Sequence, residues 1–370
     1  MKSLESLESL QTITQSFDFT RCLLDWFEQH GRYDLPWQHD PTPYRVWVSE
    51  IMLQQTQANT VIPYFIRFMK RFPDVGSLAA ADLDEVLHYW AGLGYYARGR
   101  NLHRAAKIIA QEYDGRFPTD LDTLLSLPGI GRSTAGAILA LACNQRHPIL
   151  DGNVKRVLTR FHAVRGWTGE TKVEQHLWTL AERYTPHKNV AQYTQAIMDL
   201  GAMICTRRNP RCDECPVSLE CAARKQASQH NFPSPKPRKT LPVRTTVFAI
   251  LENEQGAILL EQRAPSGVWG GLWGFPECTP QDDIRIWINN RLGFSVDAIQ
   301  YKSLIRHTFS HFHLDIIPVH VCVNSTRNIV HDSNRYCWYI PGENQLLGMA
   351  APVKKLLKEI TCLSAETLYG

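Results

Sequence analysis

The spacing of hydrophobic positions changes once along this chain, near residue 240. Before that point apolar residues recur every three or four positions, which is the period of helices that bury one face. After it they alternate with polar residues or form short runs bounded by turns, as strands do. A first helix is expected over Phe17–Gln29. Further helices are expected over 44–60, 60–71, 82–90, 98–113 and 133–142, with a longer helical stretch over 154–200.

The last third of the chain predicts a smaller α+β domain. Its first two strands, 245–251 and 257–260, flank the turn-forming stretch Glu-Asn-Glu-Gln-Gly, which is a hairpin signal. Further strands are expected over 303–309 and 313–323, and helices over 281–291 and 352–360. The segment 228–242 holds four prolines and few apolar residues, which predicts a semi-rigid linker. The predicted organisation is a multi-domain chain with a helical domain over 1–227, a linker over 228–242 and a second domain over 243–370.

Composition and charge narrow the functional classes. The chain has 370 residues, of which 44% are hydrophobic, enough for two cores and too many for a disordered protein. No run approaches the ~18 apolar residues of a membrane span. The N-terminus lacks the basic region and apolar core of a signal peptide, so we expect a cytoplasmic protein with no membrane partner, associated with the nucleoid through DNA if it is bacterial. Residues 201–240 hold 8 Lys and Arg against 3 Asp and Glu, which predicts a polyanionic partner.

The segment Leu127–Arg156 predicts a phosphate-binding turn followed by a carboxylate. Leu-Pro-Gly-Ile-Gly closes one helix and opens the next, and Gly129 and Gly131 permit the backbone conformations of a tight hairpin. The helix that follows would point its first backbone N–H groups and its positive dipole end outward, where a phosphate fits. Asp151 comes twenty residues after Gly131, just ahead of another helix. An ordinary helix turn followed by an Asp N-cap is the alternative.

Two further positions have side chains suited to DNA chemistry. Glu50 lies on the expected helix 44–60 with bulky apolar residues three or four positions away, so partial burial would raise its pKa towards that of a general acid. A surface glutamate is the alternative. Tyr95 follows a glycine-flanked loop, where its ring could replace the stacking lost when a base leaves the duplex. Ordinary packing between helices is the alternative.

Four cysteines within 17 residues have the spacing C-x6-C-x2-C-x5-C, which is typical of metal ligands. They are Cys205, Cys212, Cys215 and Cys221. An intracellular location argues against disulfides. Zinc and a [4Fe–4S] cluster both accept four thiolates, and the spacing alone does not choose between them. Because Arg207, Arg208 and Arg211 lie between the first two cysteines, we expect the metal to shape a phosphate-binding loop.

These motifs together resemble the helix-hairpin-helix DNA glycosylase superfamily that includes endonuclease III. LPGIGRSTAGAI is similar to its hairpin, LDGNVKR to its catalytic-aspartate loop, and the cysteine pattern to its [4Fe–4S] site. The resemblance is closest to the A/G-specific adenine DNA glycosylase (MutY) family and extends over nearly the whole chain. It implies two helical lobes with a cleft between them. It also implies a monofunctional, monomeric repair enzyme that flips adenine out of double-stranded DNA and removes it opposite 8-oxoguanine or guanine, which prevents G:C to T:A mutation.

The resemblance also implies roles for single residues. Glu50, in the family-like stretch WVSEIMLQQT, would protonate the adenine, and Asp151, with Asn153 beside it, would stabilise the positive sugar. Gly129 and Gly131 would bind a DNA phosphate. The residues expected to line the base pocket or probe the DNA are Arg32, Gln54, Gln55, Tyr95, Ser133 and Gln195.

The C-terminal domain resembles a Nudix fold with an altered catalytic box. Gly271 and Glu277 have the spacing that opens the box, but Ile286 replaces a glutamate, and Asn289 and Asn290 stand where the Mg²⁺-binding acids belong. Hard divalent cations need those carboxylates, so pyrophosphate hydrolysis is not expected.

The same domain holds a candidate recognition loop. Phe309, Ser310 and His311 match the Phe-Ser-His loop with which MutY proteins sense 8-oxoguanine, and an aromatic edge, a hydroxyl and an imidazole suit contact with a base and a phosphate. One turn of a histidine-rich strand region is the alternative.

Two other functions fit parts of the pattern. A glycosylase/lyase for oxidised pyrimidines, like endonuclease III, needs a nucleophilic lysine after the hairpin glycines. Ser133 occupies that position, and no lysine occurs between Lys107 and Lys155. A non-enzymatic iron–sulfur protein that binds DNA or senses redox state is opposed only by the joint presence of Glu50, Asp151 and Tyr95.

Overall fold

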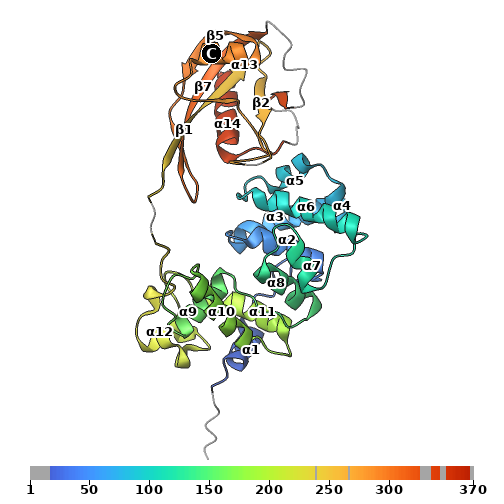
Figure 1. The fold of residues 1–370 in the computed structure, drawn as a ribbon, viewed down its shortest axis with the longest axis vertical. Helices are drawn as coiled ribbons and strands as arrows, with labels where there is room; N and C mark the ends of the chain where they lie inside the picture. The colour runs from blue at the N-terminus through green and yellow to red at the C-terminus, as the bar shows by residue number, and fades with distance from the viewer. Residues whose placement is uncertain (1–16, 238–239, 266, 326–334, 342–346, 367–370) are drawn as a thin grey trace, which may run out of the picture. The chain divides into compact units, whose positions relative to one another are not determined.

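The computed structural model describes residues 17–237, 240–265, 267–325, 335–341 and 347–366. The first 16 residues and part of the predicted linker lie outside these ranges. The chain forms two compact units, whose elements are labelled in Figure 1. Unit 1 comprises 1–43 and 131–237, and unit 2 comprises 44–130 and 238–370. The predicted helical domain therefore contributes to both units, and the boundaries at 227 and 242 stay a prediction.

Unit 1 is built from helices. They are α1 (Phe19–His30), α8 (Arg132–Cys143), α9 (Gly152–Phe161), α10 (Thr171–Tyr184), α11 (Val190–Asp199), a π-helical turn (Leu200–Ile204), single turns at Cys212–Glu214, Ser218–Glu220 and Gln229–Asn231, and α12 (Ala222–Lys225). The expected helical stretch 154–200 is thus interrupted twice. The expected helix 133–142 is α8 within one residue at each end.

The first helix shows how local sequence and burial combine in unit 1. Asp18 caps α1 by accepting hydrogen bonds from the backbone N–H groups of Thr20 and Arg21, which have no partner within the helix. Its apolar residues fall at the i, i+4, i+7 and i+8 positions of one face and are buried. They are Phe19, Leu23, Trp26 and Phe27. This face packs in one core with residues of α9, α10 and α11.

Unit 2 begins with six helices. They are α2 (Pro43–Leu53), α3 (Ala58–Arg71), α4 (Val75–Ala80), α5 (Leu83–Trp90), α6 (Ala97–Glu112) and α7 (Leu121–Ser126). The large side chains Trp47, Phe65, Phe68, Phe72 and Trp90 are fully buried among them. The expectation of one helix over 44–60 was wrong, because α2 ends at Leu53 and a turn with Gln55 in the left-handed region (φ +59°) separates it from α3.

The C-terminal part of unit 2 holds a mixed sheet. Its strands are β1 (Val243–Glu252), β2 (Ile258–Gln262), β3 (Trp273–Gly274), β4 (Glu277–Cys278), β5 (Phe294–Tyr301), β6 (Ile305–Thr308), β7 (His313–Ser325) and β8 (Tyr336–Tyr339). The main order is β3-β2-β1-β7-β5, with β1 and β7 parallel, while β4 pairs with β1, β6 with β7 and β8 with β2. The predicted hairpin is present, since β1 and β2 pair antiparallel with Glu252 opposite Ile258.

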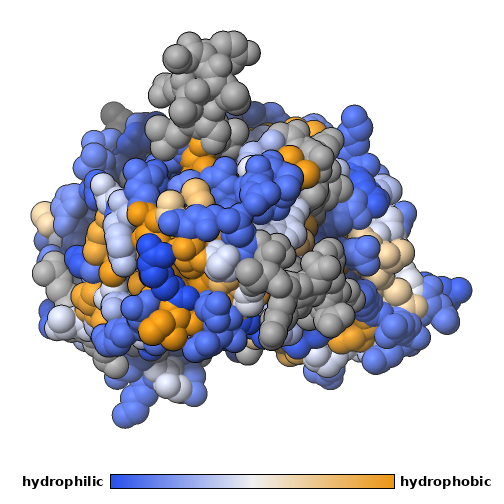
Figure 2. Space-filling view, turned by 90° about the horizontal axis from the view of Figure 1, so that it is seen from above, coloured by the Kyte–Doolittle hydropathy of each residue, from blue (hydrophilic) through white to orange (hydrophobic). Residues whose placement is uncertain are grey.

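Alternate residues of β1 pack against different helices, because successive side chains of a strand point to opposite faces of the sheet. Phe248 and Ile250 share a core with α14 (Ala351–Glu366), whereas Val247, Ala249 and Leu251 share one with α13 (Ile284–Leu292). The α+β expectation for this part of the chain is confirmed. The surface in Figure 2 is largely hydrophilic, with apolar residues in small patches. Among the described residues, no helix is both long and apolar enough to cross a membrane.

Candidate functional site

Asp151 is held in a fixed position at the start of α9. As the N-cap it accepts a 2.8 Å hydrogen bond from the Val154 backbone N–H, and its other oxygen accepts one of 3.1 Å from Asn153 Nδ2. Burial raises the pKa of the carboxyl above its ordinary value, while these hydrogen bonds and the nearby Arg156 oppose the rise. A carboxylate that stays ionised in such surroundings is a strong electrostatic stabiliser of an adjacent positive charge.

The glycine turn ahead of α8 has the features expected of a backbone anion site. Gly129 has φ +83°, where a side chain would be strained, and an added Cβ would lie 2.9 Å from Asn101 Cβ. Gly131 is the N-cap of α8 and is exposed, with nothing within 4 Å of an added Cβ. Ser133 is turned to the chain itself, since its Oγ accepts a 3.0 Å hydrogen bond from the Leu150 backbone N–H, one residue before Asp151.

Arg32 and Gln195 meet on a buried acid that the sequence analysis did not single out. Asp199, which is 0% exposed, accepts hydrogen bonds from the Arg32 backbone N–H (2.8 Å) and from its Nε (2.9 Å) and Nη2 (2.6 Å). Gln195 Nε2 donates to the same carboxylate at 2.8 Å. An acid four residues after Gln195 on one helix face was the available signal, but its partner Arg32 is 167 residues away in sequence.

A second network joins the Asp151 turn to the cysteine segment. Gly201 packs against Asn153 so closely that an added Cβ would lie 2.5 Å from Asn153 Cβ. Arg156 donates to the Gly201 carbonyl at 2.6 Å, to Asn153 Oδ1 at 2.8 Å and to the Cys205 carbonyl at 2.6 Å. The first cysteine is therefore tied through one guanidinium to the residue beside Asp151.

Unit 2 holds the other candidates from the helical region. Glu50 lies on α2, half-buried, between the buried residues Ser49 and Ile51. Gln54 and Gln55 form the turn that follows α2, and Gln55 is exposed. Tyr95 lies ahead of α6, 51% exposed, with φ +48°.

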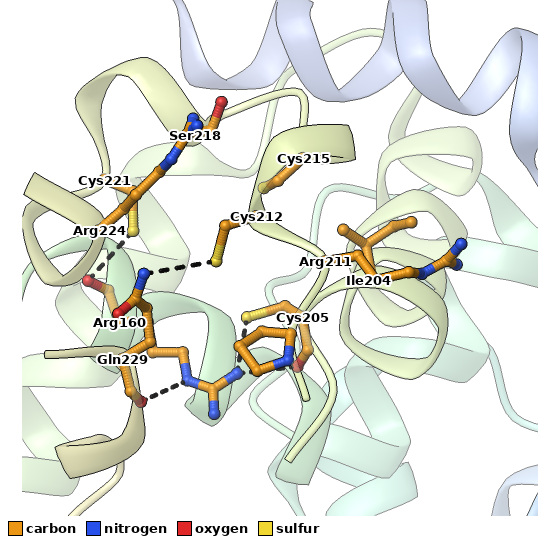
Figure 3. Close-up of a pocket in the computed structure, with 11 residues that line it drawn as sticks. Arg160, Ile204, Cys205, Arg211, Cys212, Cys215, Ser218, Cys221, Arg224 and Gln229 are labelled. Atoms are coloured by element: carbon orange, nitrogen blue, oxygen red, sulfur yellow. Dashed lines mark hydrogen bonds between the residues drawn. The ribbon is translucent and has the colours of Figure 1, made fainter. Parts of the chain in front are cut away.

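The four cysteines line one pocket, shown in Figure 3. Arg160 also lines this pocket. Its Nη1 lies 3.3 Å from Cys205 Sγ and 2.7 Å from the Thr206 carbonyl oxygen, and its Nη2 lies 3.0 Å from the Arg207 carbonyl oxygen. Gln229 Nε2 lies 3.7 Å from Cys212 Sγ, and Cys221 Sγ lies 3.5 Å from the Arg160 carbonyl oxygen.

The donor set of this pocket fits an iron–sulfur cluster. Four sulfurs surround a common space, and N–H donors from Arg160 and Gln229 reach two of them, as they do around cluster thiolates. In the part of the chain that the structure describes, no three His, Cys, Asp or Glu side chains are grouped as ligands of a single metal ion.

The predicted recognition residues lie at the tip of the β6–β7 hairpin. Phe309 packs on Trp269 and His307 (centroids 5.3 and 4.6 Å) and stacks on the buried Phe312 at 4.7 Å. Ser310 and His311 are exposed, with Ser310 Oγ 3.3 Å from His311 Nδ1. The hairpin thus rests on an aromatic base and presents a hydroxyl and an imidazole to solvent.

The residues of the altered Nudix box have structural partners or face solvent. Glu277 forms an ion pair with Arg263 and accepts a hydrogen bond from Thr246. Asn289 and Asn290 lie exposed on α13. Amide groups in place of carboxylates leave this helix without the charge that Mg²⁺ requires.

Comparison with known proteins agrees with this arrangement. Residues 48–183 match the HhH-GPD superfamily of base excision DNA repair proteins, 205–218 the iron-sulfur binding domain of endonuclease III, and 246–359 the NUDIX domain. The solved structure of a thermostable thymine-DNA glycosylase aligns with 56% of this chain and 95% of its own, at 27% identity and a TM-score of 0.50. The fold and the cysteine site thus define a helix-hairpin-helix DNA glycosylase with a [4Fe–4S] cluster and a C-terminal Nudix-like domain.

Two named relatives identify the family within this class. The adenine DNA glycosylase of Buchnera aphidicola subsp. Schizaphis graminum is 40% identical over 341 residues, which cover 92% of this chain and 98% of that protein. The human adenine DNA glycosylase is 35% identical, over 84% of this chain and 68% of its own. The chain belongs to the adenine DNA glycosylase family.

Proposed function

We propose that this protein is a monofunctional, monomeric DNA glycosylase that removes adenine paired with 8-oxoguanine or guanine in double-stranded DNA, so that the pair does not become a G:C to T:A mutation. The observation that carries the proposal is the Asp151 carboxylate. It is half-buried, fixed by Val154 and Asn153, and placed at the N-cap of α9. Family membership supports adenine as the base, and the position of Asp151 supports the proposed chemistry.

Hydrolysis of an N-glycosidic bond passes through an oxocarbenium-like state, which two carboxyl groups with different roles can serve. Asp151 would act as the ionised partner, stabilising the positive sugar or attacking it. Glu50 would protonate the adenine and so make it a leaving group, then help to activate water. Glu50 lies half-buried on α2, between the buried residues Ser49 and Ile51.

Two observations favour simple hydrolysis over lyase chemistry. Ser133, at the position where a lyase has its lysine, is engaged with the Leu150 backbone and has no amine to form a Schiff base. Lys155, the nearest lysine to Asp151 in sequence, places its Nζ 2.6 Å from Glu174 Oε1. The amine of Lys155 is therefore already engaged in an ion pair with a carboxylate.

The buried group of Arg32, Gln195 and Asp199 would form the wall against which adenine is read. The Gln195 amide uses its Nε2 to bind Asp199, which leaves its carbonyl oxygen directed by that bond. An acceptor in a fixed direction suits the exocyclic amino group of adenine. The Arg32 guanidinium, held by the same acid, would act beside it.

Contacts outside the pocket would position the duplex and read the opposite base. The exposed Gly131 turn at the start of α8 would bind a phosphate. The four cysteines would hold the cluster and so fix the loop that carries the exposed Arg207, Arg208 and Arg211. These cations would contact the DNA backbone. Ser310 and His311 would contact 8-oxoguanine from the β6–β7 hairpin.

The test is single-turnover excision of adenine from a duplex that carries one A opposite 8-oxoguanine. Asp151→Asn should keep duplex binding and lower the excision rate by about 10²–10³-fold, as loss of a transition-state charge partner does. Asp25→Asn, on the exposed face of α1, is the matched control and should excise at the wild-type rate. An Asp151→Asn protein with wild-type turnover would exclude the proposed mechanism.

A further inference from the structure

Arg98, at the start of α6, holds two separate turns of unit 2. Its Nη1 donates to the Ile51 and Met52 carbonyls at 2.9 Å each, and also to the Gln54 carbonyl. Its Nη2 lies 3.2 Å from Thr56 Oγ1. One guanidinium therefore takes up the carbonyl groups at the C-terminal end of α2, which have no partner within the helix.

The same guanidinium also binds the loop before α6. Nη2 lies 3.2 Å from the Leu93 carbonyl and 3.3 Å from the Gly94 carbonyl, and the cation stands 5.4 Å from the centre of the Tyr95 ring. The buried Trp90 supports this loop, since its Nε1 donates to the Gly94 carbonyl at 3.2 Å. The two turns are far apart in sequence but share one cation.

Each turn contains a non-glycine residue in the left-handed backbone region. These are Gln55 (φ +59°) and Tyr95 (φ +48°), and both side chains are exposed. Such a conformation is unfavourable for a residue with a side chain and persists only where its surroundings impose it. Arg98 binds the residue immediately before each of them, so one side chain contacts both strained turns.

Burial of the charged Arg98 side chain has a cost that calls for a specific role. Within the described residues, its hydrogen-bond and ring partners are carbonyl oxygens, a hydroxyl oxygen and two aromatic rings, and none of these contacts is with a carboxylate. Burial lowers the pKa of the guanidinium to about 10, so folding opposes the charged form. A buried cation is costly unless it is well paired. Arg98 offsets that cost by donating to the carbonyl groups of both turns, which an apolar side chain would leave without a donor.

We propose that Arg98 is a positioning residue that locks the Gln54–Thr56 turn and the Leu93–Tyr95 turn into one preformed wedge for displacing the target base. This inference rests on the proposed function, because it assigns Gln54, Gln55 and Tyr95 to DNA probing. Arg98 itself touches no DNA. It acts by removing the freedom of two loops before the duplex arrives, which lowers the entropy that must be lost on binding.

The test uses the full-length protein with its cluster and a duplex that carries fluorescent 2-aminopurine in place of the target adenine, opposite 8-oxoguanine. The fluorescence rises when the base leaves the stack, so it reports displacement separately from bond cleavage. Arg98→Lys keeps a positive charge but not the planar fork that binds both turns. We expect base displacement and single-turnover excision to be slower by about 10- to 100-fold, with duplex affinity changed far less.

A double-mutant cycle separates positioning from a general loss of stability. Because part of the effect of Arg98 passes through the Tyr95 turn, Arg98→Lys should add less than its own full defect to that of Tyr95→Ala. Arg71→Lys is the matched control, because Arg71 also makes a forked interaction on a helix of unit 2, with Glu85, but binds neither turn. It should displace the base at the wild-type rate.

Each other outcome decides the question. Wild-type displacement by folded Arg98→Lys, or defects that multiply in the double variant, would overturn the positioning role. If Arg98→Lys does not fold, Thr56→Val removes one acceptor of Arg98 and should slow displacement in the same direction; unchanged displacement would then reject the proposal. Absence of any signal or excision with the wild-type protein would instead show that the proposed function fails, and the inference with it.

Discussion

The Asp151 carboxylate accepts a 2.8 Å hydrogen bond from the Val154 backbone N–H, so the proposed catalytic carboxylate is also the N-cap of α9. The two roles oppose each other. The cap stabilises the helix, whereas burial of the carboxylate disfavours its charged form and raises its pKa. Catalysis needs that charged form, so the site keeps a group that folding disfavours.

Replacing the charge should therefore stabilise the protein. Asn is as good an N-cap as Asp, so Asp151→Asn keeps the cap and removes the buried charge. Because the folded-state pKa is raised, the native carboxylate costs stability above that pKa and costs nothing below the unfolded-state pKa. We expect Asp151→Asn to melt at a higher temperature than wild type at neutral pH, and the difference to vanish as the pH falls towards the ordinary value of 3.8. Equal melting temperatures at neutral pH would contradict this.

The raised pKa of Asp151 also predicts the acid side of the pH profile. Excision needs the ionised carboxylate, so the single-turnover rate should begin to fall at a pH clearly above the ordinary aspartate value of 3.8. Rates measured between about pH 4 and 8, with binding saturated at each pH, would show this limb. A rate that stays constant down to the ordinary aspartate range would mean that the Asp151 charge does not limit the chemistry.

Asp199 should matter more for stability than any exposed acid of unit 1. Its carboxylate is fully buried and binds both Arg32 and Gln195, so Asp199→Asn leaves a guanidinium without its anion. Breaking such a pair from one side costs about 3–5 kcal/mol. Asp25→Asn removes an exposed partner of Arg21 at 3.8 Å and should cost under about 1 kcal/mol. Urea denaturation would give the free energy of unfolding of each variant. Equal losses would show that the Asp199 network does not stabilise unit 1 more than an exposed ion pair does.

The exposed tip of the β6–β7 hairpin should govern the choice of opposite base. Ser310→Ala with His311→Ala removes two polar groups that face solvent, while Phe309 keeps its aromatic support. We expect excision of A opposite 8-oxoguanine to slow by about 10-fold or more, with A opposite G nearly unchanged, because one lost polar contact to a base is worth ~1–3 kcal/mol. Ser303→Ala, exposed in the preceding loop, is the control. An equal loss on both substrates would assign the hairpin to general DNA binding.

Local sequence was enough to predict the features that depend on neighbouring residues. The glycine turn, the Asp151 cap, the cysteine spacing and the β1–β2 hairpin all arise from short-range backbone rules. The end of α2 does not follow from such short-range rules. No glycine or proline directly follows Leu53 to mark the end of the helix, and α2 stops where Arg98, more than 40 residues later, binds its carbonyl groups. Asp199 was missed for the same reason, because its partner Arg32 lies at the other end of unit 1 in sequence.

The most direct test of the proposed function compares duplexes that carry one A opposite 8-oxoguanine, G or T, or one thymine glycol, under single-turnover conditions. Strands are read with and without hot alkali. We predict alkali-dependent cleavage at A opposite 8-oxoguanine, slower cleavage opposite G, and none at thymine glycol. Alkali-independent cleavage at thymine glycol would contradict the monofunctional adenine assignment, and binding without cleavage of any duplex would show that the protein is not a glycosylase.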